Sequence, residues 1–175
     1  MLVRGWRGCA RASRRRGNLK LAREDNMADA APDFDRSLLG REITSGRLEI
    51  TEDLARRYCR VLGETRPAYA DGDEARRQGH RGQLVPPTVV NLMIHRLDRP
   101  DVESSLGKTR LHGSQSLELL APICVGDTLE VRSVLQDVYA KTGRTGTMTF
   151  VVWENRFVNQ DGQVAVRMSE SFMYR

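Results

Sequence analysis

The chain has 175 residues, of which 39% are hydrophobic and 29% are charged. A chain of this length can bury one core without disulfides or metals, and this composition excludes an intrinsically disordered or fibrous protein. No apolar stretch approaches the roughly 20 residues that a membrane-spanning helix needs. We therefore expect one globular domain with no membrane partner.

The formal net charge of +5 is unevenly distributed. Residues 1–26 carry a balance of +6, which leaves residues 27–175 at −1. We expect residues 1–30 to form a basic, disordered extension outside the fold. Three interpretations stay open: a nucleic-acid-binding arm, a mitochondrial transit peptide, or an extension upstream of a true start at Met27. We favour the last and expect no nucleic-acid partner, because nothing in the remaining chain requires one.

The three cysteines (Cys9, Cys59 and Cys124) form no close pair and no Cys/His cluster. This pattern favours free thiols in a reducing, cytoplasmic compartment, and it predicts no metal site.

The first predicted elements are a strand or extended arm over residues 41–50 and a helix that Thr51 caps. Glu52 and Asp53 suit the first turn of that helix, and Gly63 ends it. Its apolar face is expected to comprise Leu54, Tyr58, Val61 and Leu62.

Residues 64–84 are polar and predict a loop with a short helix over residues 73–78. A second helix begins at Pro86 and Pro87, since proline is tolerated in a first helical turn. It is apolar on almost all sides as far as Leu97, which is typical of a buried helix.

The pattern then changes to a period of two. Four strands are predicted, over residues 111–120, 128–139, 147–158 and 164–174, and Asp161-Gly162 indicates a hairpin turn between the last two. A buried helix followed by an antiparallel meander predicts an α+β hotdog fold over residues 36–175, a long central helix wrapped by the sheet. A remaining sheet edge would favour edge-to-edge dimerisation.

Residues 58–71 resemble the signature of MaoC-like (R)-specific enoyl-thioester hydratases, Gly-Asp-x-Asn-Pro-x-His. Gly63, Pro67 and Asp71 fit it, but Glu64 stands at the Asp position, Arg66 at the Asn position and Tyr69 at the His position. Three further segments support the comparison: Leu84-Val-Pro-Pro-Thr88, Leu111-His-Gly-Ser-Gln115 with Pro122 and Gly126-Asp127, and Asn159-Gln-Asp-Gly162. The nearest pattern is that of the N-terminal, type-I-fatty-acid-synthase-like MaoC dehydratase domain.

The resemblance implies a subunit that handles a CoA or acyl-carrier-protein thioester without a cofactor. In such systems a degenerate hotdog pairs with a catalytic one, which supplies the Asp and His. It therefore implies a homo- or hetero-oligomer with another MaoC-like hotdog. A non-catalytic acyl-thioester-binding module or structural subunit is the alternative.

The substitutions argue against independent catalysis. A tyrosine hydroxyl at position 69 is a poor base, because tyrosine ordinarily ionises near pH 10. Glu64 projects one methylene further than Asp, and Arg66 can hold it as an inert ion pair. A misplacement of about 1 Å can cost about a hundredfold in rate.

Other candidates have ordinary structural explanations beside the functional ones. His112 could replace the missing histidine, or it could pack and shape an acyl tunnel. His95 fits the role of a hydrogen-bonded structural histidine, and His80 fits an exposed position in a polar loop. Arg66 is a candidate substrate-binding residue. Arg76, Arg77 and Arg81 are candidates to contact the phosphates of coenzyme A or the acidic face of an acyl carrier protein, although arginines in surface loops are usually only solvated. The acyl chain is expected along the central helix at Pro87, Thr88 and Asn91, and backbone N–H groups near Gly82 or Gly113 are candidates to polarise the carbonyl.

Overall fold

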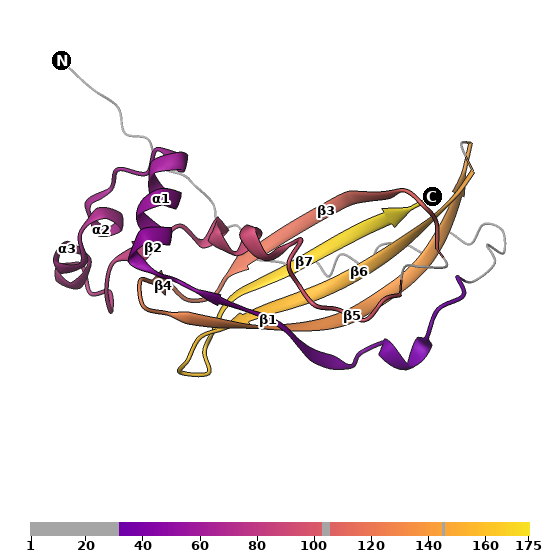
Figure 1. Cartoon of the computed structure of the whole chain (residues 1–175), viewed down its shortest axis with the longest axis horizontal. Helices are drawn as coiled ribbons and strands as arrows, with labels where there is room; N and C mark the ends of the chain where they lie inside the picture. The colour runs from indigo at the N-terminus through magenta and orange to yellow at the C-terminus, as the bar shows by residue number, and fades with distance from the viewer. Residues whose placement is uncertain (1–31, 103–105, 145) are drawn as a thin grey trace, which may run out of the picture.

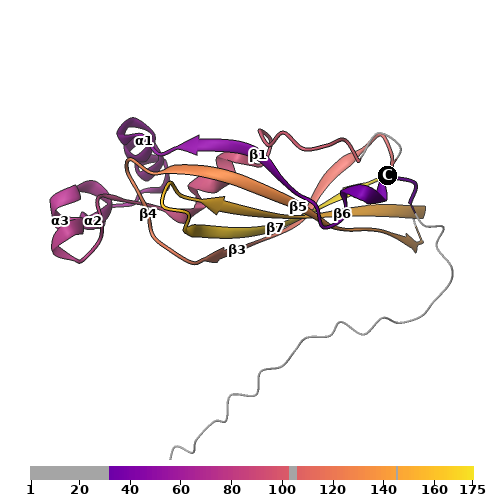
Figure 2. The same cartoon turned by 90° about the horizontal axis from the view of Figure 1, so that it is seen from below.

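The chain folds around one five-stranded antiparallel sheet with the strand order β1-β5-β6-β7-β3. The computed structural model describes residues 32–102, 106–144 and 146–175, so the basic extension and Cys9 lie outside the described residues. The strands run along the long axis of the molecule, and α1, α2 and α3 gather at one end of the sheet (Figures 1 and 2). The strands are β1 (Glu42–Glu49), β3 (Arg110–Leu119), β5 (Thr128–Gly143), β6 (Gly146–Val158) and β7 (Val164–Tyr174). The predicted α+β class and all five long strands are confirmed.

Helix α1 (Glu52–Leu62) begins and ends as its sequence predicts. The Thr51 hydroxyl accepts a hydrogen bond from the Leu54 N–H at 3.2 Å, and Gly63 closes the helix at φ 65°. The predicted apolar face is wrong at its end, because Val61 is 82% exposed. Ala55 and Cys59, one turn apart, are the buried residues instead, so α1 contacts the fold with its middle turns only.

Two short helices follow in the polar segment, α2 (Pro67–Ala70) and α3 (Gly72–Arg77). Asp71 caps α3 by accepting a hydrogen bond from the Asp73 N–H at 2.8 Å. The chain then enters β2 (Leu84–Val85), which pairs with β4 (Ile123–Cys124) as a separate two-stranded ribbon. This ribbon joins the helical end of the molecule to the sheet.

The central helix is shorter and tighter than expected. It is a 3₁₀ helix, η2 (Pro87–Met93), and not a long α-helix that reaches Leu97. The β-branched Val89 and Val90 lose side-chain freedom in a helix, and 3₁₀ segments are rarely long. Val89 and Val90 are fully buried, and a Cβ atom at Gly46 of β1 would lie 3.0 Å from the Met93 Cε atom. The small residue in β1 therefore lets the central helix approach the sheet.

A row of polar side chains crosses the buried face of the sheet. Ser45 of β1 contacts Ser133 of β5, whose hydroxyl donates to the Asn155 Oδ1 atom at 2.6 Å. Asn155 in turn donates to Glu170 of β7 at 3.1 Å, and the Arg99 guanidinium lies 2.6 Å from the same carboxylate oxygen. These contacts attach the segment after η2 to four strands.

The sheet has two edges, β1 and β3, where the sequence suggested one. Among the strands of the described residues, β3 pairs only with β7, and it is exposed along almost its whole length. Large exposed apolar residues lie on it or just after it: Leu111, Leu117, Leu119 and Leu120. The predicted hairpin between β6 and β7 is confirmed, and Gly162 in its turn has a φ of 78°. No helix within the described ranges is long and apolar enough to cross a membrane.

Candidate functional site

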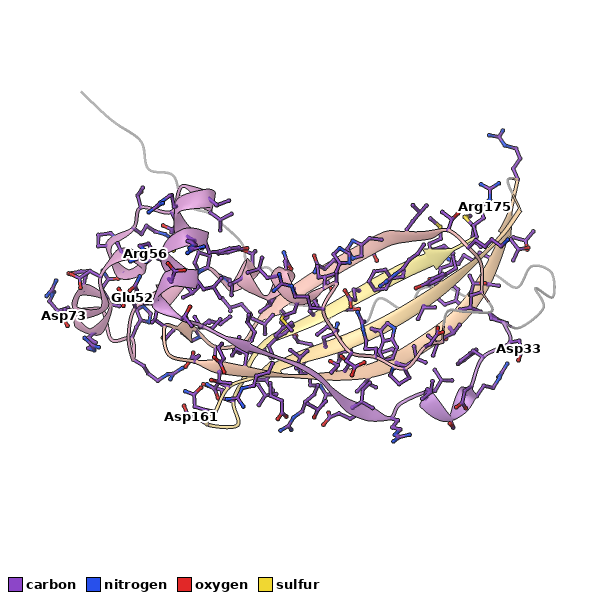
Figure 3. All side chains as sticks on the ribbon, viewed as in Figure 1. Asp33, Glu52, Arg56, Asp73, Asp161 and Arg175 are labelled. Atoms are coloured by element: carbon purple, nitrogen blue, oxygen red, sulfur yellow. The ribbon has the colours of Figure 1, made fainter. Side chains whose placement is uncertain are left out.

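The signature-like loop and the start of the central helix meet at one cavity of about 530 Å³. Arg66 and Tyr69 come from the loop, Pro87 opens η2, and Leu119 lies at the end of β3. The lining is mainly apolar and comprises Arg66, Pro67, Ala68, Tyr69, Gln78, His80, Leu84, Val85, Pro87, Leu119, Pro122 and Ile123. The cavity is therefore at the helical end of the molecule, the end marked by Glu52, Arg56 and Asp73 in Figure 3. Its apolar walls suit a short acyl chain.

Arg66 holds Glu64 in a bidentate ion pair. The Glu64 carboxylate accepts hydrogen bonds from the Arg66 side chain through both oxygens, and from the Arg66 backbone N–H at 2.9 Å. These hydrogen bonds to Arg66 lower the pKa of Glu64 to about 2. The same guanidinium lies 4.4 Å from the centre of the Tyr69 ring. Glu64 is thus the ionised partner of Arg66 at neutral pH, which makes it a poor proton carrier.

Tyr69 lines two cavities. It lines the larger cavity with Arg66, and also a smaller one of about 310 Å³ that Glu64 and Cys59 line. The Tyr69 carbonyl accepts a hydrogen bond from the Gln83 side chain at 2.8 Å. The two residues predicted as the degenerate catalytic pair, Glu64 and Tyr69, thus share the smaller cavity, but only Tyr69 also lines the larger one.

The two polar residues expected along the acyl chain already have partners within the protein. Thr88 accepts a hydrogen bond from the Tyr58 hydroxyl at 3.1 Å, and Asn91 accepts one from Gln115 of β3 at 3.0 Å. Neither lines the large cavity. These bonds fix the central helix between α1 and the edge strand, so only Pro87 of the three predicted residues faces the cavity.

Arg81 is engaged in a structural ion pair instead of facing the cavity. Its guanidinium donates to both carboxylate oxygens of Asp127, at 3.0 and 3.1 Å. Asp127 is 2% exposed and also accepts hydrogen bonds from the Cys124 N–H and the Gln160 side chain. Burial raises the pKa of the Cys124 thiol, partly opposed by hydrogen bonds from the backbone of Gly82 and Arg81. Gly82, predicted as a backbone donor to the substrate carbonyl, does not line the large cavity.

The residues predicted on β3 lie outside the cavity. His112 is exposed, and its ring packs against Phe172 with centroids 5.3 Å apart. Gly113 lies in a bulge of the β3–β7 ladder, where a Cβ atom would be 3.3 Å from the Ser171 carbonyl oxygen. His95 is exposed in the turn after η2. The structure thus explains Gly113 by close backbone approach and His112 by packing.

His80 is the cavity residue that sequence reasoning missed. It lies in the loop between α3 and β2, is half-buried, and lines the large cavity together with Tyr69. Its Gly-His-Arg-Gly setting suggested mere exposure, since a polar loop gives no periodic signal of burial. The sequence did contain a signal for this position. The loop runs from the short helix α3 to the Leu84-Val-Pro-Pro-Thr88 segment, so it leads to the start of the central helix.

Within the described ranges, no group of three or more His, Cys, Asp or Glu side chains could hold a metal ion. The cavity instead combines an apolar floor with an arginine, a tyrosine and a histidine. Such an arrangement can bind an uncharged chain that carries a polar head group.

Comparison with known proteins places this geometry in a family. The chain is 31% identical over 115 residues to a UPF0336 protein of Streptomyces griseus, a match that covers 63% of this chain and 77% of that protein. In structure it resembles the R-hydratase PhaJ1 of Pseudomonas aeruginosa, with a TM-score of 0.60, 18% identity, and coverage of 78% and 81% of the two chains. It also resembles the HadBC (3R-hydroxyacyl-ACP dehydratase) complex of Mycobacterium tuberculosis, with a TM-score of 0.61, 19% identity, and coverage of 78% and 96%. These likenesses confirm the predicted hotdog fold. Because residues 37–168 match the FAS1-like dehydratase domain region, the chain belongs to that family of hotdog proteins, which confirms the MaoC-like resemblance.

Proposed function

We propose that this protein is a hotdog subunit of an enoyl-thioester hydratase or (3R)-hydroxyacyl-thioester dehydratase. We further propose that a second hotdog chain supplies the catalytic Asp and His. The observation that carries this proposal is the cavity in which the signature-like loop, through Arg66 and Tyr69, meets Pro87 of the central helix. Membership of the dehydratase family supports the reaction class. The presence of Glu64 and Tyr69 at the Asp and His positions of the loop supports the need for a second, catalytic chain.

The cavity supports an acyl thioester as the ligand. Its floor is formed by Ala68, Leu84, Val85 and Ile123, all of which are buried apolar residues. Polar groups lie on other parts of the lining: Arg66, Gln78 and His80. An acyl chain would bury its methylene groups against the floor, at roughly 0.8 kcal/mol per methylene. The arginine would lie near the head group, where a phosphate or carbonyl can accept its hydrogen bonds.

The hydration step explains why a partner is needed. A base takes a proton from water while the water oxygen bonds to the β-carbon of the enoyl group. The π electrons move to the α-carbon and carbonyl as an enolate, and an acid then protonates the α-carbon. Glu64, ionised and bound through both oxygens to Arg66, has little capacity for either transfer.

The edge strand β3 supports association with another hotdog. It carries Leu111, Leu117 and Leu119 in exposed positions, and its outer backbone groups face no strand of the described chain. Such an edge is a template for pairing with another chain. Leu119 also lines the large cavity, so a chain paired with β3 would lie beside the site. The similar HadBC structure is itself a complex.

A direct test measures hydration of crotonyl-CoA and mesaconyl-CoA by the full chain, alone and with a MaoC-like protein that carries the Asp and His. We expect the mixture to exceed the sum of the separate rates at least tenfold, with co-elution of the two chains. No complex and no gain in rate would refute the two-chain enzyme. Retained thioester binding in that case would favour the alternative, a non-catalytic binding module, which the inert Glu64–Arg66 pair already suits.

A further inference from the structure

The cavity contains one side chain whose chemistry the proposed function has not used. Of the three histidines, His95 and His112 are exposed and lie outside the cavity lining, whereas His80 is half-buried within it. No hydrogen bond or ion pair engages the His80 imidazole among the residues that the structure describes, which leaves both ring nitrogens available to a ligand.

The loop that carries His80 is fixed on both sides of that residue. The His80 backbone N–H donates to the Ala75 carbonyl at 3.0 Å, and Ala75 is fully buried. The next residue, Arg81, is bound to the buried Asp127 through two hydrogen bonds. A side chain between two such anchors is presented to the cavity by a defined backbone, as proton transfer at a fixed atom requires.

The other ionisable groups around the cavity are poorly suited to exchange a proton near neutral pH. Arg66 stays charged, and its bonds to Glu64 raise its pKa further. Tyrosine ordinarily ionises near pH 10 and is therefore a weak base. An imidazole, by contrast, ordinarily changes its protonation state between pH 5 and 8. By elimination, His80 is the suitable proton carrier among the residues that line this cavity.

We propose that His80 is a proton-transfer residue that takes the place of the histidine replaced by Tyr69. It gives the isolated chain a low hydratase activity of its own, separate from the activity gained with a partner. This inference rests on the proposed function for its substrate class. In the step, the His80 imidazole accepts a proton from water as the water oxygen bonds to the β-carbon. The imidazolium then returns a proton to the α-carbon of the enolate, so that one water is added and the imidazole is regenerated.

The test uses the full chain without a partner and follows loss of the enoyl absorbance of crotonyl-CoA. We expect slow turnover by the isolated chain, because the His80 imidazole can accept a proton from water. His80→Gln should lower the rate at least about a hundredfold, which is the lower end of what general acid–base catalysis contributes. His95→Gln, at an exposed histidine outside the lining of this cavity, is the matched control and should keep the wild-type rate.

A second variant separates chemistry from folding. His80→Ala leaves space in a cavity of about 530 Å³, so added free imidazole should restore part of the rate if the side chain acts as a proton carrier. A merely structural His80 would give no such rescue. Absence of turnover by the isolated chain, or equal rates for the wild type and His80→Gln, would overturn the inference. If the isolated chain is inactive but the mixture with a partner chain is active, the proposed function still stands. If the mixture is also inactive, the proposed function is refuted separately.

Discussion

The buried ion pair between Arg99 and Glu170 provides the strongest prediction about stability. The Arg99 Nη1 atom lies 2.6 Å from the Glu170 Oε1 atom, and the two side chains are 9% and 0% exposed. Arg99 also lies over the rings of Trp153 and Phe172, at 5.0 and 5.6 Å from their centroids. The substitution Arg99→Met would keep much of the packing but leave the carboxylate buried without its cation.

Removal of one partner from a buried pair typically destabilises a protein by about 3–5 kcal/mol. In a chain of this size each kcal/mol corresponds to roughly 2–4 °C in melting temperature, so we expect a decrease of roughly 6–20 °C. The assay is urea unfolding at neutral pH, with thermal unfolding as a second measurement. Arg99→Met combined with Glu170→Met should recover most of the loss, because apolar replacement of both partners is often neutral.

The control for this prediction is Arg132→Met on the exposed face of the sheet. Arg132 pairs with Glu130 at 2.7 Å, but the two side chains are 43% and 45% exposed. Such surface pairs contribute at most about 1 kcal/mol. If Arg99→Met costs no more than Arg132→Met, the buried pair does not hold the segment after η2 against the sheet and the reasoning is refuted.

Three further outcomes are expected. The pKa of Glu64 is lowered from 4.5 to about 2, so its ion pair with Arg66 stabilises the folded state above pH 4.5 and this contribution is lost as the pH falls toward 2. Carboxyl NMR should show this low pKa, and Arg66→Gln should move the pKa of Glu64 back toward 4.5. Asp127→Ala should weaken thioester binding measured by calorimetry by displacing the loop that Arg81 anchors, and unchanged affinity would contradict that role. Leu117→Arg on the exposed edge strand should abolish association with a partner hotdog in gel filtration while leaving the melting temperature unchanged; persistence of the complex would place the interface elsewhere.

The fold was largely predictable because its signals are local. Thr51 and Gly63 mark the ends of α1, and Asp161-Gly162 marks the hairpin between β6 and β7. The α+β layout follows from a period of two after a buried apolar segment. The conformation of the central helix was less predictable, because the helix packs closely on the sheet through residues far apart in the sequence, such as Met93 and Gly46.

The candidate site was only partly predictable. The loop around Arg66 and Tyr69 was recognisable by resemblance, and the Glu64–Arg66 pair by charge and proximity in sequence. Arg81 and His80 were interpreted less well, because their roles depend on partners elsewhere in the chain. Asp127 lies 46 positions from Arg81, and a polar loop does not reveal which of two neighbouring residues faces a cavity.

The central claim is that the large cavity binds an acyl thioester, and blocking that cavity tests it most directly. Gln78 is an exposed residue of the lining at the end of α3, and its neighbour Arg77 lies outside the lining, so the two offer a matched pair of positions. The measurement is equilibrium binding of crotonyl-CoA by calorimetry to the wild type, Gln78→Trp and Arg77→Trp. We predict at least tenfold weaker binding for Gln78→Trp and near-wild-type binding for Arg77→Trp. Equal affinities for all three proteins, or no binding to the wild type, would contradict the assignment of this cavity to an acyl thioester.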